Sequence, residues 1–356
     1  CGCILGSCAS MAGESAINSR PAFTEEEILI AASKFGDFVF VKKLPSERDQ
    51  NLLLQRKGGT EADMVVFKVH NPSDSADFVE CQNQALELAA SNGCSCQRLL
   101  STLEGGEKIV ELSTTAGGVC LCRMLTFLPG GMLAEVAPSW PDQANLWSEV
   151  GKAVGSVTKA LQDLNHSAAH IIGFDWDLQR CEEVITQKST CLPEQRQAMI
   201  AKFLREYQSD VKPLLSKLRK SVVHNDGNDY NIVVDRNSGQ VGLLDFGDML
   251  YSYTCADAAI CMAYLLFHVP AEKSLVSSMV PFVRSFYEQC PLTAEELQVV
   301  FGLAIVRVCT SVCMSAFQSS LEPDNEYLLI SAGPAWALLE RLERESGADT
   351  EKPGDV

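Results

Sequence analysis

Residues 224–231 read His-Asn-Asp-Gly-Asn-Asp-Tyr-Asn, and residues 245–248, which begin fourteen positions after the first stretch ends, read Asp-Phe-Gly-Asp. Together they supply a carboxylate at Asp226, a carboxamide at Asn231 and a second carboxylate at Asp245. Such oxygens are the ligands that Mg²⁺ prefers, and two of them can hold the ion while water completes its octahedron. The spacing therefore predicts a proton-accepting carboxylate beside a magnesium site.

Apolar runs flank both stretches and predict the local fold. Short runs rich in valine and leucine occupy 221–223, 232–234 and 241–244, and the turn-forming sequence Asn-Ser-Gly occupies 237–239. Such runs around a turn are typical of a β-hairpin, whose open ends lie side by side. We therefore expect the carboxamide and the second carboxylate to lie close together. The alternative is an ordinary hairpin whose Asp and Asn side chains only serve its turns.

The offsets match the catalytic loop of protein kinases, H-R-D-L-x-x-x-N followed by D-F-G. In that pattern the first Asp accepts the proton of the attacking hydroxyl group, and the Asn and the second Asp bind Mg²⁺. We predict that His224 and Asp226 are catalytic, with Asp226 as the base, and that Asn231 and Asp245 are metal ligands. The implied chemistry is phosphoryl transfer from a nucleoside triphosphate.

The composition limits the class of partner. A chain of 356 residues with 46% hydrophobic residues fits a globular protein of two lobes. Its net charge of −17 argues against nucleic acid or an anionic membrane as partner, because both require basic surface. The acidity fits a cationic second substrate, and it is also a common route to solubility.

Fifteen cysteines predict a reducing compartment, the cytoplasm, without disulfides or a zinc site. They form no Cys-x-x-Cys pair, and most lie in apolar runs, where a thiol packs as a small hydrophobic group.

No apolar run is expected to span a membrane, since 255–269 has only about fifteen residues and contains an aspartate. The N-terminus is not typical of a signal peptide, and Met11 is a candidate start. Palmitoylation is the alternative role for Cys1, Cys3 and Cys8.

The overall pattern predicts an α+β, bilobal, protein-kinase-like fold. We expect a flexible leader at 1–22, an N-lobe that binds nucleotide phosphates at 23–125, a C-lobe with the catalytic loop and acceptor site at 126–345, and a disordered tail at 346–356. The N-lobe pattern predicts a short helix capped by Thr24, a second helix at 77–91, and strands at 38–41, 52–54, 64–69, 108–112 and 119–125. Helices of the C-lobe are expected at 143–165, 194–219, 254–267, 272–289, 294–319 and 328–344.

Lys68, in the segment Val-Phe-Lys-Val, stands where a kinase places the lysine that contacts the α- and β-phosphates. We expect its acidic partner on the helix at 77–91. Glu80 is the first choice because it is nearer the start of the helix, and Glu87 is the alternative. A solvent-exposed lysine at a strand edge is the other interpretation.

The turn expected to cover the phosphates, 44–51, reads Leu-Pro-Ser-Glu-Arg-Asp-Gln-Asn and contains no glycine. A protein kinase has G-x-G-x-x-G at this place, so the turn argues against a typical protein kinase. Backbone N–H groups of a tight turn can still hold phosphate, and Ser46 and Arg48 are predicted as further donors.

Six segments in order along the chain resemble the aminoglycoside phosphotransferase-like kinase family, and within it the hydroxylysine kinase branch. The resemblance covers about residues 28–343. The segments are Leu-Pro-Ser-Glu-Arg-Asp-Gln-Asn (44–51), Phe-Lys-Val-His-Asn-Pro (67–72), Arg-Met-Leu-Thr-Phe-Leu-Pro-Gly (123–130), Asp-Trp-Asp-Leu (175–178), His-Asn-Asp-Gly-Asn-Asp-Tyr-Asn (224–231) and Leu-Asp-Phe-Gly-Asp-Met (244–249).

The resemblance implies Mg²⁺ and transfer of the γ-phosphoryl group of GTP or ATP to the hydroxyl group of a small amine or amino acid. It implies that a hinge at 124–128 binds the nucleotide base through Met124, Thr126 and Phe127. Asn225 and Gly227 depart from the family, which commonly has Gly before the base and Leu after it. Some members of the branch are fused to a PLP-dependent domain, so the chain is either a standalone enzyme or part of such a fusion.

An acceptor that carries an ammonium group requires nearby carboxylates. The candidates, each with an ordinary alternative as helix cap or surface charge, are Asp248, Asp229, Asp175 and Asp177, with Trp176 for a cation–π contact. Hydroxylysine is the leading acceptor, and choline, ethanolamine, homoserine or an aminoglycoside is the nearer alternative. A nucleotide-binding pseudokinase is the alternative from another class, and it has no need for the base Asp226.

Overall fold

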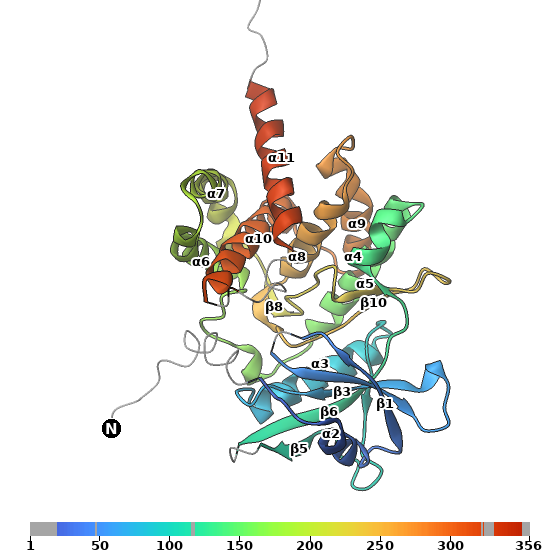
Figure 1. Ribbon diagram of the computed structural model, residues 1–356. Helices are drawn as coiled ribbons and strands as arrows, with labels where there is room; N and C mark the ends of the chain where they lie inside the picture. The colour runs from blue at the N-terminus through green and yellow to red at the C-terminus, as the bar shows by residue number, and fades with distance from the viewer. Residues whose placement is uncertain (1–19, 47, 115–117, 322, 324–330, 351–356) are drawn as a thin grey trace, which may run out of the picture. The chain divides into compact units, whose positions relative to one another are not determined.

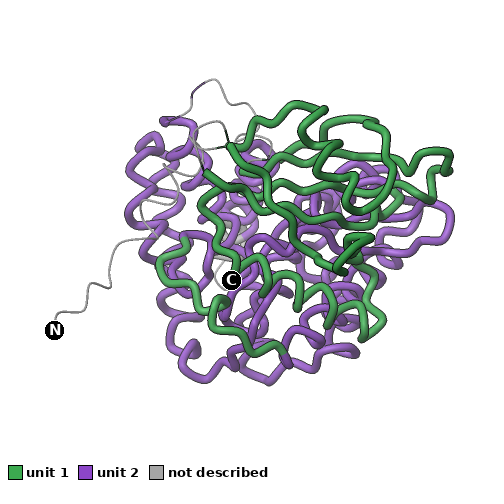
Figure 2. Tube along the Cα trace, turned by 90° about the horizontal axis from the view of Figure 1, so that it is seen from below, with its two compact units in different colours: residues 1–130, 164–174 green, residues 131–163, 175–356 purple. Residues whose placement is uncertain are grey.

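The computed structural model describes all residues except 1–19, 47, 115–117, 322, 324–330 and 351–356. The chain divides into two compact units, of which unit 1 comprises 1–130 and 164–174 and unit 2 comprises 131–163 and 175–356 (Figure 1, Figure 2). The boundary predicted from the sequence lies after residue 125, and the assignment of 164–174 to unit 1 was not predicted. Most of the expected leader lies outside the described residues, as do Met11 and the cysteines considered for palmitoylation.

Unit 1 is built on an antiparallel sheet with strand order β1-β2-β3-β6-β4, and β5 also pairs with β6. The predicted strands are confirmed, and the two-residue β4, too short to leave a pattern, was missed. The strands are β1 (Phe38–Leu44), β2 (Gln50–Arg56), β3 (Met64–Val69), β4 (Leu99–Leu100), β5 (Val110–Ser113) and β6 (Val119–Thr126). The helices are α2 (Glu25–Ala32) and α3 (Ala76–Ser91).

Helix α2 begins at the predicted cap. The Thr24 hydroxyl accepts from the backbone N–H of Glu27 at 3.3 Å, and the Glu27 carboxylate accepts from the backbone N–H of Thr24 at 2.8 Å. This reciprocal pair satisfies two donors that the first turn otherwise leaves unbonded.

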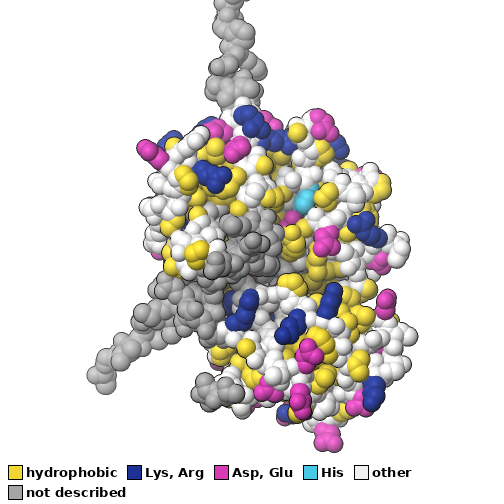
Figure 3. Space-filling model, in the orientation of Figure 1, with side chains coloured by type: hydrophobic (Ala, Val, Ile, Leu, Met, Phe, Trp, Pro, Cys, Tyr) yellow, Lys and Arg dark blue, Asp and Glu magenta, His cyan; other side chains and the backbone are white. Residues whose placement is uncertain are grey.

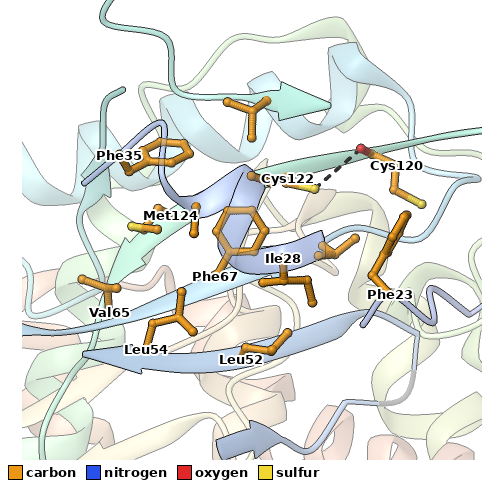
Figure 4. Packing of buried hydrophobic residues seen from close by; sticks show 14 residues of the cluster. Phe23, Ile28, Phe35, Leu52, Leu54, Val65, Phe67, Cys120, Cys122 and Met124 are labelled. Atoms are coloured by element: carbon orange, nitrogen blue, oxygen red, sulfur yellow. Dashed lines mark hydrogen bonds between the residues drawn. The ribbon is translucent and has the colours of Figure 1, made fainter. Parts of the chain in front are cut away.

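The two faces of the unit 1 sheet differ in chemistry. Phe67 of β3 stands opposite Met124 of β6, and both belong to an apolar core that includes Ile28 of α2 (Figure 4). The next pair in register is Lys68 opposite Arg123. Because successive side chains of a strand point to opposite faces, this second pair lies on the other face, which is where α3 packs through its contacts with Arg123.

Unit 2 is mainly helical and carries two small antiparallel sheets. Its helices are α4 (Leu133–Val136), α5 (Gln143–Leu161), α6 (Cys181–Lys188), α7 (Glu194–Glu206), α8 (Ala256–Leu265), α9 (Leu275–Gln289), α10 (Ala294–Leu321) and α11 (Ala332–Thr350). The sheets have the orders β10-β9-β7 and β11-β8. Their strands are β7 (Gly131–Met132), β8 (Lys220–Val223), β9 (Ile232–Val234), β10 (Val241–Leu243) and β11 (Leu250–Tyr253).

Two of the predicted elements end elsewhere. The single helix expected at 194–219 stops at Glu206 and continues as a π turn at Tyr207–Val211 and a 3-10 segment at Lys212–Lys217. Pro213 lies in the last segment and lacks the N–H that an α-helix would use. The expected disordered tail is also wrong in part, since α11 runs to Thr350, three positions before Pro353.

Helix α10 is a long and mostly buried helix of unit 2. It has 28 residues with a mean hydropathy of 2.0 in its most apolar window, long and apolar enough by itself to cross a membrane, which corrects the expectation that no run reaches that length. However, 83% of that window is buried inside the protein, as expected for the core helix of a folded unit.

On the described part of the face drawn in Figure 3, acidic and basic side chains are interspersed, so the charge of −17 is not concentrated there.

Candidate active site

The catalytic hairpin of unit 2 is formed by β9 and β10, which pair with Ile232 opposite Leu243. One step beyond this pair, the backbone N–H of Leu244 donates to the carbonyl of Asn231 at 2.8 Å. Asp245 therefore follows directly on the residue bonded to Asn231, as predicted from the two apolar runs and their turn.

The carboxylate of Asp226 is held by two carboxamides. Asn231 Nδ2 donates to Asp226 Oδ2 at 2.6 Å, and Asn228 Nδ2 donates to Asp226 Oδ1 at 2.9 Å. Asn228 is fixed in turn, because its Oδ1 accepts from the backbone N–H groups of Tyr230 and Asn231. The oxygens of Asp226 are thus oriented by side chains of its own loop.

Burial and, next, the neighbouring Asp248 carboxylate raise the pKa of Asp226 to about 8, although Arg307 acts in the opposite direction. A proton acceptor works best when its pKa lies near the operating pH. The surroundings of Asp226 therefore suit a general base and not a merely structural carboxylate.

The predicted metal ligands present suitable donor atoms. Since Nδ2 of Asn231 donates to Asp226, the remaining amide atom is the oxygen that Mg²⁺ requires. Asp245 has a left-handed backbone with φ of 51°, and its Oδ1 accepts from the N–H of Gly247 at 3.0 Å. A Cβ at Gly247 would approach that oxygen to 2.9 Å, so a larger residue here would displace the Asp245 carboxylate. One amide oxygen and one carboxylate fit a divalent cation of the hard type.

His224 is a positioning residue and not the catalytic group that the motif predicted. Its Nδ1 accepts from the backbone N–H of Asp226 at 3.3 Å, which leaves Nε2 as the protonated nitrogen that donates to the carbonyl of Leu244 at 2.9 Å. Both ring nitrogens are thus occupied, the ring is fully buried against Phe246, and burial lowers the pKa of His224. The imidazole joins the catalytic loop to the strand that leads to Asp245.

Asp257 of α8 supports the same loop and was missed as a functional residue. Its buried carboxylate accepts from the backbone N–H groups of His224 at 3.2 Å and Asn225 at 2.8 Å, and from the Thr158 hydroxyl at 2.8 Å. Burial raises the pKa of Asp257. The available signal in the sequence was a lone aspartate within the apolar stretch 255–269.

Asn225 stands directly before Asp226, where the family commonly has glycine. The residue has a φ of +65°, where glycine carries no steric penalty and asparagine is among the best tolerated other residues. The replacement of the usual glycine therefore keeps the backbone of the loop. At Gly227, a Cβ would meet Cys261 at 3.7 Å, an ordinary contact.

The predicted acceptor carboxylates fall into two groups. Asp177 caps a turn by accepting from the N–H of Gln179 at 3.0 Å and the Ser252 hydroxyl at 2.6 Å, and Asp175 forms an ion pair with Arg180 at 2.8 Å. These two serve local structure, which corrects their prediction as ammonium ligands.

Asp229 and Asp248 lie nearer the base. Asp229 is 5% exposed, and its Oδ2 is 2.8 Å from Nε2 of His268, while its Oδ1 is buried without a hydrogen-bond partner. Asp248 is close enough to Asp226 to act on its charge. These two carboxylates remain candidates for an ammonium group.

Trp176 makes its cation–π contact within the protein. The guanidinium of Arg307 lies 4.6 Å from the centre of the indole ring, and Nη2 of Arg307 is 3.6 Å from Asp226 Oδ1. Sequence reasoning missed Arg307 because it is surrounded by apolar residues of α10. An arginine within such a helix was the available signal.

In unit 1, Lys68 forms an ion pair with Asp49, with 2.9 Å between Nζ and Oδ2. This corrects the expected pairing with Glu80, which is exposed and accepts from Asn83 and Gln84 of its own helix. Glu87 pairs with Lys108 at the surface. Helix α3 instead presents the amide oxygens of Gln82 and Asn83 to Arg123.

The turn at 44–51 is organised by its own polar contacts. The Ser46 hydroxyl accepts from the N–H of Asp49 at 3.1 Å, and Arg48 pairs with Asp74 at 2.7 Å. Asp74 also contacts Nδ1 of His70 at 3.2 Å. Asp49, His70 and Asp74 have ligand atoms within 4.8 Å of one another, but Lys68 and Arg48 already supply two cations to them.

Burial by itself raises the pKa of Asp49, but Lys68 and His70 more than offset this, and the pKa lies below its usual range. A cavity of about 390 Å³ opens on this turn, and its lining includes Phe23, Lys43, Ser46 and Asp49. The turn therefore lines a cavity, and Asp49 of the same turn holds the ammonium group of Lys68.

The predicted hinge residues are mostly used by the sheet. Met124 is fully buried in the apolar core, so its side chain cannot contact a nucleotide base (Figure 4). The backbone N–H of Thr126 donates to the carbonyl of Arg98 at 2.9 Å, and the Thr126 hydroxyl accepts from the backbone N–H of Arg98 at 2.8 Å. The Thr126 carbonyl accepts from Gln97 Nε2 at 3.2 Å. The N–H of Phe127 donates to Met64 at 3.2 Å. This corrects the expectation that Met124 and Thr126 bind the base. The segment after Phe127 stays a candidate for contact with the nucleotide base.

Comparison with known proteins adds independent information. A model of the phosphotransferase enzyme family matches residues 42–274. Hydroxylysine kinase of Mus musculus is 31% identical over 352 residues, with 92% of each chain covered. Hydroxylysine kinase of Xenopus laevis is 28% identical, with 91% of each chain covered.

Solved structures show the same fold at lower identity. An amicoumacin kinase in complex with AMP-PNP and Ca²⁺ has a TM-score of 0.65 at 15% identity, covering 90% of this chain and 94% of that chain. A microcompartment-associated aminopropanol kinase has a TM-score of 0.59 at 15% identity, covering 90% and 97%. The predicted α+β, protein-kinase-like fold is confirmed.

Proposed function

The chain belongs to the phosphotransferase enzyme family, and we propose that it transfers the γ-phosphoryl group of ATP or GTP to the hydroxyl group of hydroxylysine with the help of Mg²⁺. As a member of this family it is a kinase that acts on an alcohol group of a small molecule. The donor nucleotide, the metal and the acceptor are the proposed parts.

One observation carries the proposal. Asp226 lies 2.6 Å from the carboxamide of Asn231, whose backbone is bonded to the residue preceding Asp245. A base and two oxygen ligands are thus joined through a single hairpin. This arrangement suits phosphoryl transfer, in which the protein mainly positions the reactants and balances charge.

The acceptor hydroxyl group donates a hydrogen bond to a free lone pair of Asp226. As the oxygen attacks phosphorus, its proton passes to this carboxylate, the bond from phosphorus to the bridging oxygen breaks, and the nucleoside diphosphate leaves. Asn231 Oδ1 and Asp245 would hold Mg²⁺, which neutralises phosphate charge when bound. Lys68 contributes a cation toward the phosphates, and Asp49 orients its ammonium group.

The choice of hydroxylysine rests on two supports. Relatives that share about nine-tenths of their length with this chain are hydroxylysine kinases. Asp248 supplies negative charge near the base, and Asp229 is a further buried carboxylate of the same loop, as an acceptor with ammonium groups requires.

A panel assay tests the proposal. The purified protein is incubated with Mg²⁺ and either ATP or GTP, and with hydroxylysine, ethanolamine, choline, homoserine, aminopropanol or an aminoglycoside. Nucleoside diphosphate release is measured, and the phosphorylated product is identified by mass spectrometry. We expect turnover with hydroxylysine to exceed that with the other acceptors. Release with another acceptor alone would overturn the choice of substrate, and release with none would overturn the kinase activity.

A further inference from the structure

Arg307 is a buried cation in an apolar helix. It lies in the middle of α10 between Val306 and Val308, and it is 2% exposed. Burial of a guanidinium is costly unless its donors are paired and its charge is balanced. An arginine at this position therefore calls for a partner that compensates its desolvation.

Only some of the hydrogen-bond donors of Arg307 have partners in the protein. Nη1 donates to the carbonyl of Trp176 at 2.8 Å, and the side chain is hydrogen-bonded to Tyr264. Nη2 is 3.6 Å from Asp226 Oδ1, longer than the 2.7–2.9 Å of a charge-assisted hydrogen bond. Nε is buried without a hydrogen-bond partner. Donors of a nearly fully buried arginine thus remain available beside the base.

The two oxygens of Asp226 define two sides of the site. Oδ2 faces Asn231, a proposed metal ligand, and so marks the side of the phosphoryl group. Oδ1 faces Asn228 and Arg307. The unsatisfied donors are therefore associated with the oxygen away from the metal ligand, where the acceptor would lie.

We propose that Arg307 binds the carboxylate of the acceptor, so that the enzyme selects a hydroxylated amino acid over an amino alcohol without a carboxylate. This inference rests on the proposed kinase function and deepens it by naming the group that is recognised. Guanidinium and carboxylate match each other in shape and pair through parallel hydrogen bonds. The partly buried indole of Trp176, against which Arg307 stacks, offers an apolar surface for the carbon chain.

The charges around the base agree with a zwitterionic acceptor. Asp229 and Asp248 favour ammonium groups, whereas Arg307 repels them. A purely cationic acceptor such as choline would place positive charge beside a buried guanidinium without compensation. An amino acid would supply a carboxylate to the guanidinium donors that Asp226 leaves without a hydrogen bond.

The test compares acceptors that differ only at the carboxylate. These are hydroxylysine, its carboxamide, and the decarboxylated diamine 1,5-diaminopentan-2-ol. The parent enzyme, Arg307→Gln and Arg307→Lys are assayed for kcat and KM with each acceptor. Arg284→Gln, which removes an exposed arginine of α9, is the matched control. Thermal unfolding and Mg-nucleotide binding establish that each variant is folded.

We expect the parent to prefer hydroxylysine over both analogues. Arg307→Gln should lower kcat/KM for hydroxylysine by about 30- to 5000-fold, the usual range for truncating one partner of a buried charged pair. Because Arg307 also acts on Asp226, kcat/KM for the two analogues should fall as well, but by a factor at least about tenfold smaller, and Arg307→Lys should lie between. The ratio of kcat/KM for hydroxylysine to kcat/KM for its analogues should therefore be much smaller in Arg307→Gln than in the parent.

Two results would overturn the inference. An equal fall for all three acceptors would mean that Arg307 acts on the base or on the phosphoryl group, which every acceptor shares. A parent enzyme that does not distinguish hydroxylysine from its carboxamide would refute carboxylate recognition even if the variants fail to fold. Neither result touches the kinase proposal, which fails only if no hydroxyl acceptor is phosphorylated, and the inference then falls with it.

Discussion

Replacement of the base, Asp226→Asn, tests the chemistry of the site most directly. The substitution keeps the size of the side chain and removes its ability to accept a proton. A positioned general base contributes about 10²- to 10⁴-fold to a rate, so kcat should fall by that factor. In free energy this is an increase in the barrier of about 2.7–5.5 kcal/mol.

The structure also predicts the effect on stability. Both oxygens of Asp226 face carboxamide donors, so either orientation of the new amide places an NH₂ group against Asn228 or Asn231. Neither neighbour can rotate without losing other bonds, because Asn228 Oδ1 accepts two backbone N–H groups and Asn231 Nδ2 also donates to the carbonyl of Asp226 at 3.0 Å.

The lost hydrogen bond to a charged group is worth about 1.5–3 kcal/mol. Burial and the neighbouring Asp248 disfavour the charge of Asp226, and the substitution relieves that cost. The two effects oppose each other, and we expect the free energy of unfolding to change by less than about 2 kcal/mol. The variant should therefore be folded while nearly inactive.

The assay measures nucleoside diphosphate release at saturating Mg-nucleotide and acceptor, with nucleotide binding followed by calorimetry. Asp210→Asn removes an exposed carboxylate of unit 2 and serves as the control. A kcat within about threefold of the parent in a folded Asp226→Asn variant, when a base is worth at least 10²-fold, would refute the assignment.

Three further substitutions probe the supports of the site. Asp245→Ala removes a proposed metal ligand and should abolish turnover or raise the Mg²⁺ concentration for half-maximal rate; an unchanged Mg²⁺ titration would contradict this. Asp49→Asn should raise the KM for nucleotide about tenfold, because the Lys68 ammonium loses the ion pair that orients it; an unaltered KM would show that the pair is dispensable. The pKa of Asp49 is lowered in the folded protein, so its charge stabilises the fold above the unfolded pKa of about 4, and the stability difference between parent and this variant should shrink as the pH falls below that value. Asp257→Ala leaves two backbone N–H groups of the catalytic loop without an acceptor and should lower the free energy of unfolding by about 2–5 kcal/mol in urea titration; a loss below about 1 kcal/mol would mean that the loop finds other acceptors.

Local patterns predicted the parts of the fold that depend on neighbours in the chain. The capping box at Thr24 and the hairpin that joins Asn231 to the strand before Asp245 are settled by residues a few positions apart. These features appear in the structure where the sequence placed them.

Long-range choices were predicted less well. The partner of Lys68 was sought on α3 by analogy with kinases, but the inward face of that helix carries Gln82 and Asn83, which contact Arg123. The sequence could not rank Asp49 above Glu80, because the two differ in which face of the sheet and helix they occupy. That depends on how α3 is rotated as it packs.

The roles of polar residues in apolar surroundings were decided by tertiary structure alone. The sequence by itself determined the class of enzyme, since the predicted base and the two predicted metal ligands lie within one short segment whose spacing the hairpin fixes. Only packing brought Asp257 under the backbone of the catalytic loop and Arg307 beside Asp226. A buried charge must find its compensating partners, and those partners come from helices far apart in the chain.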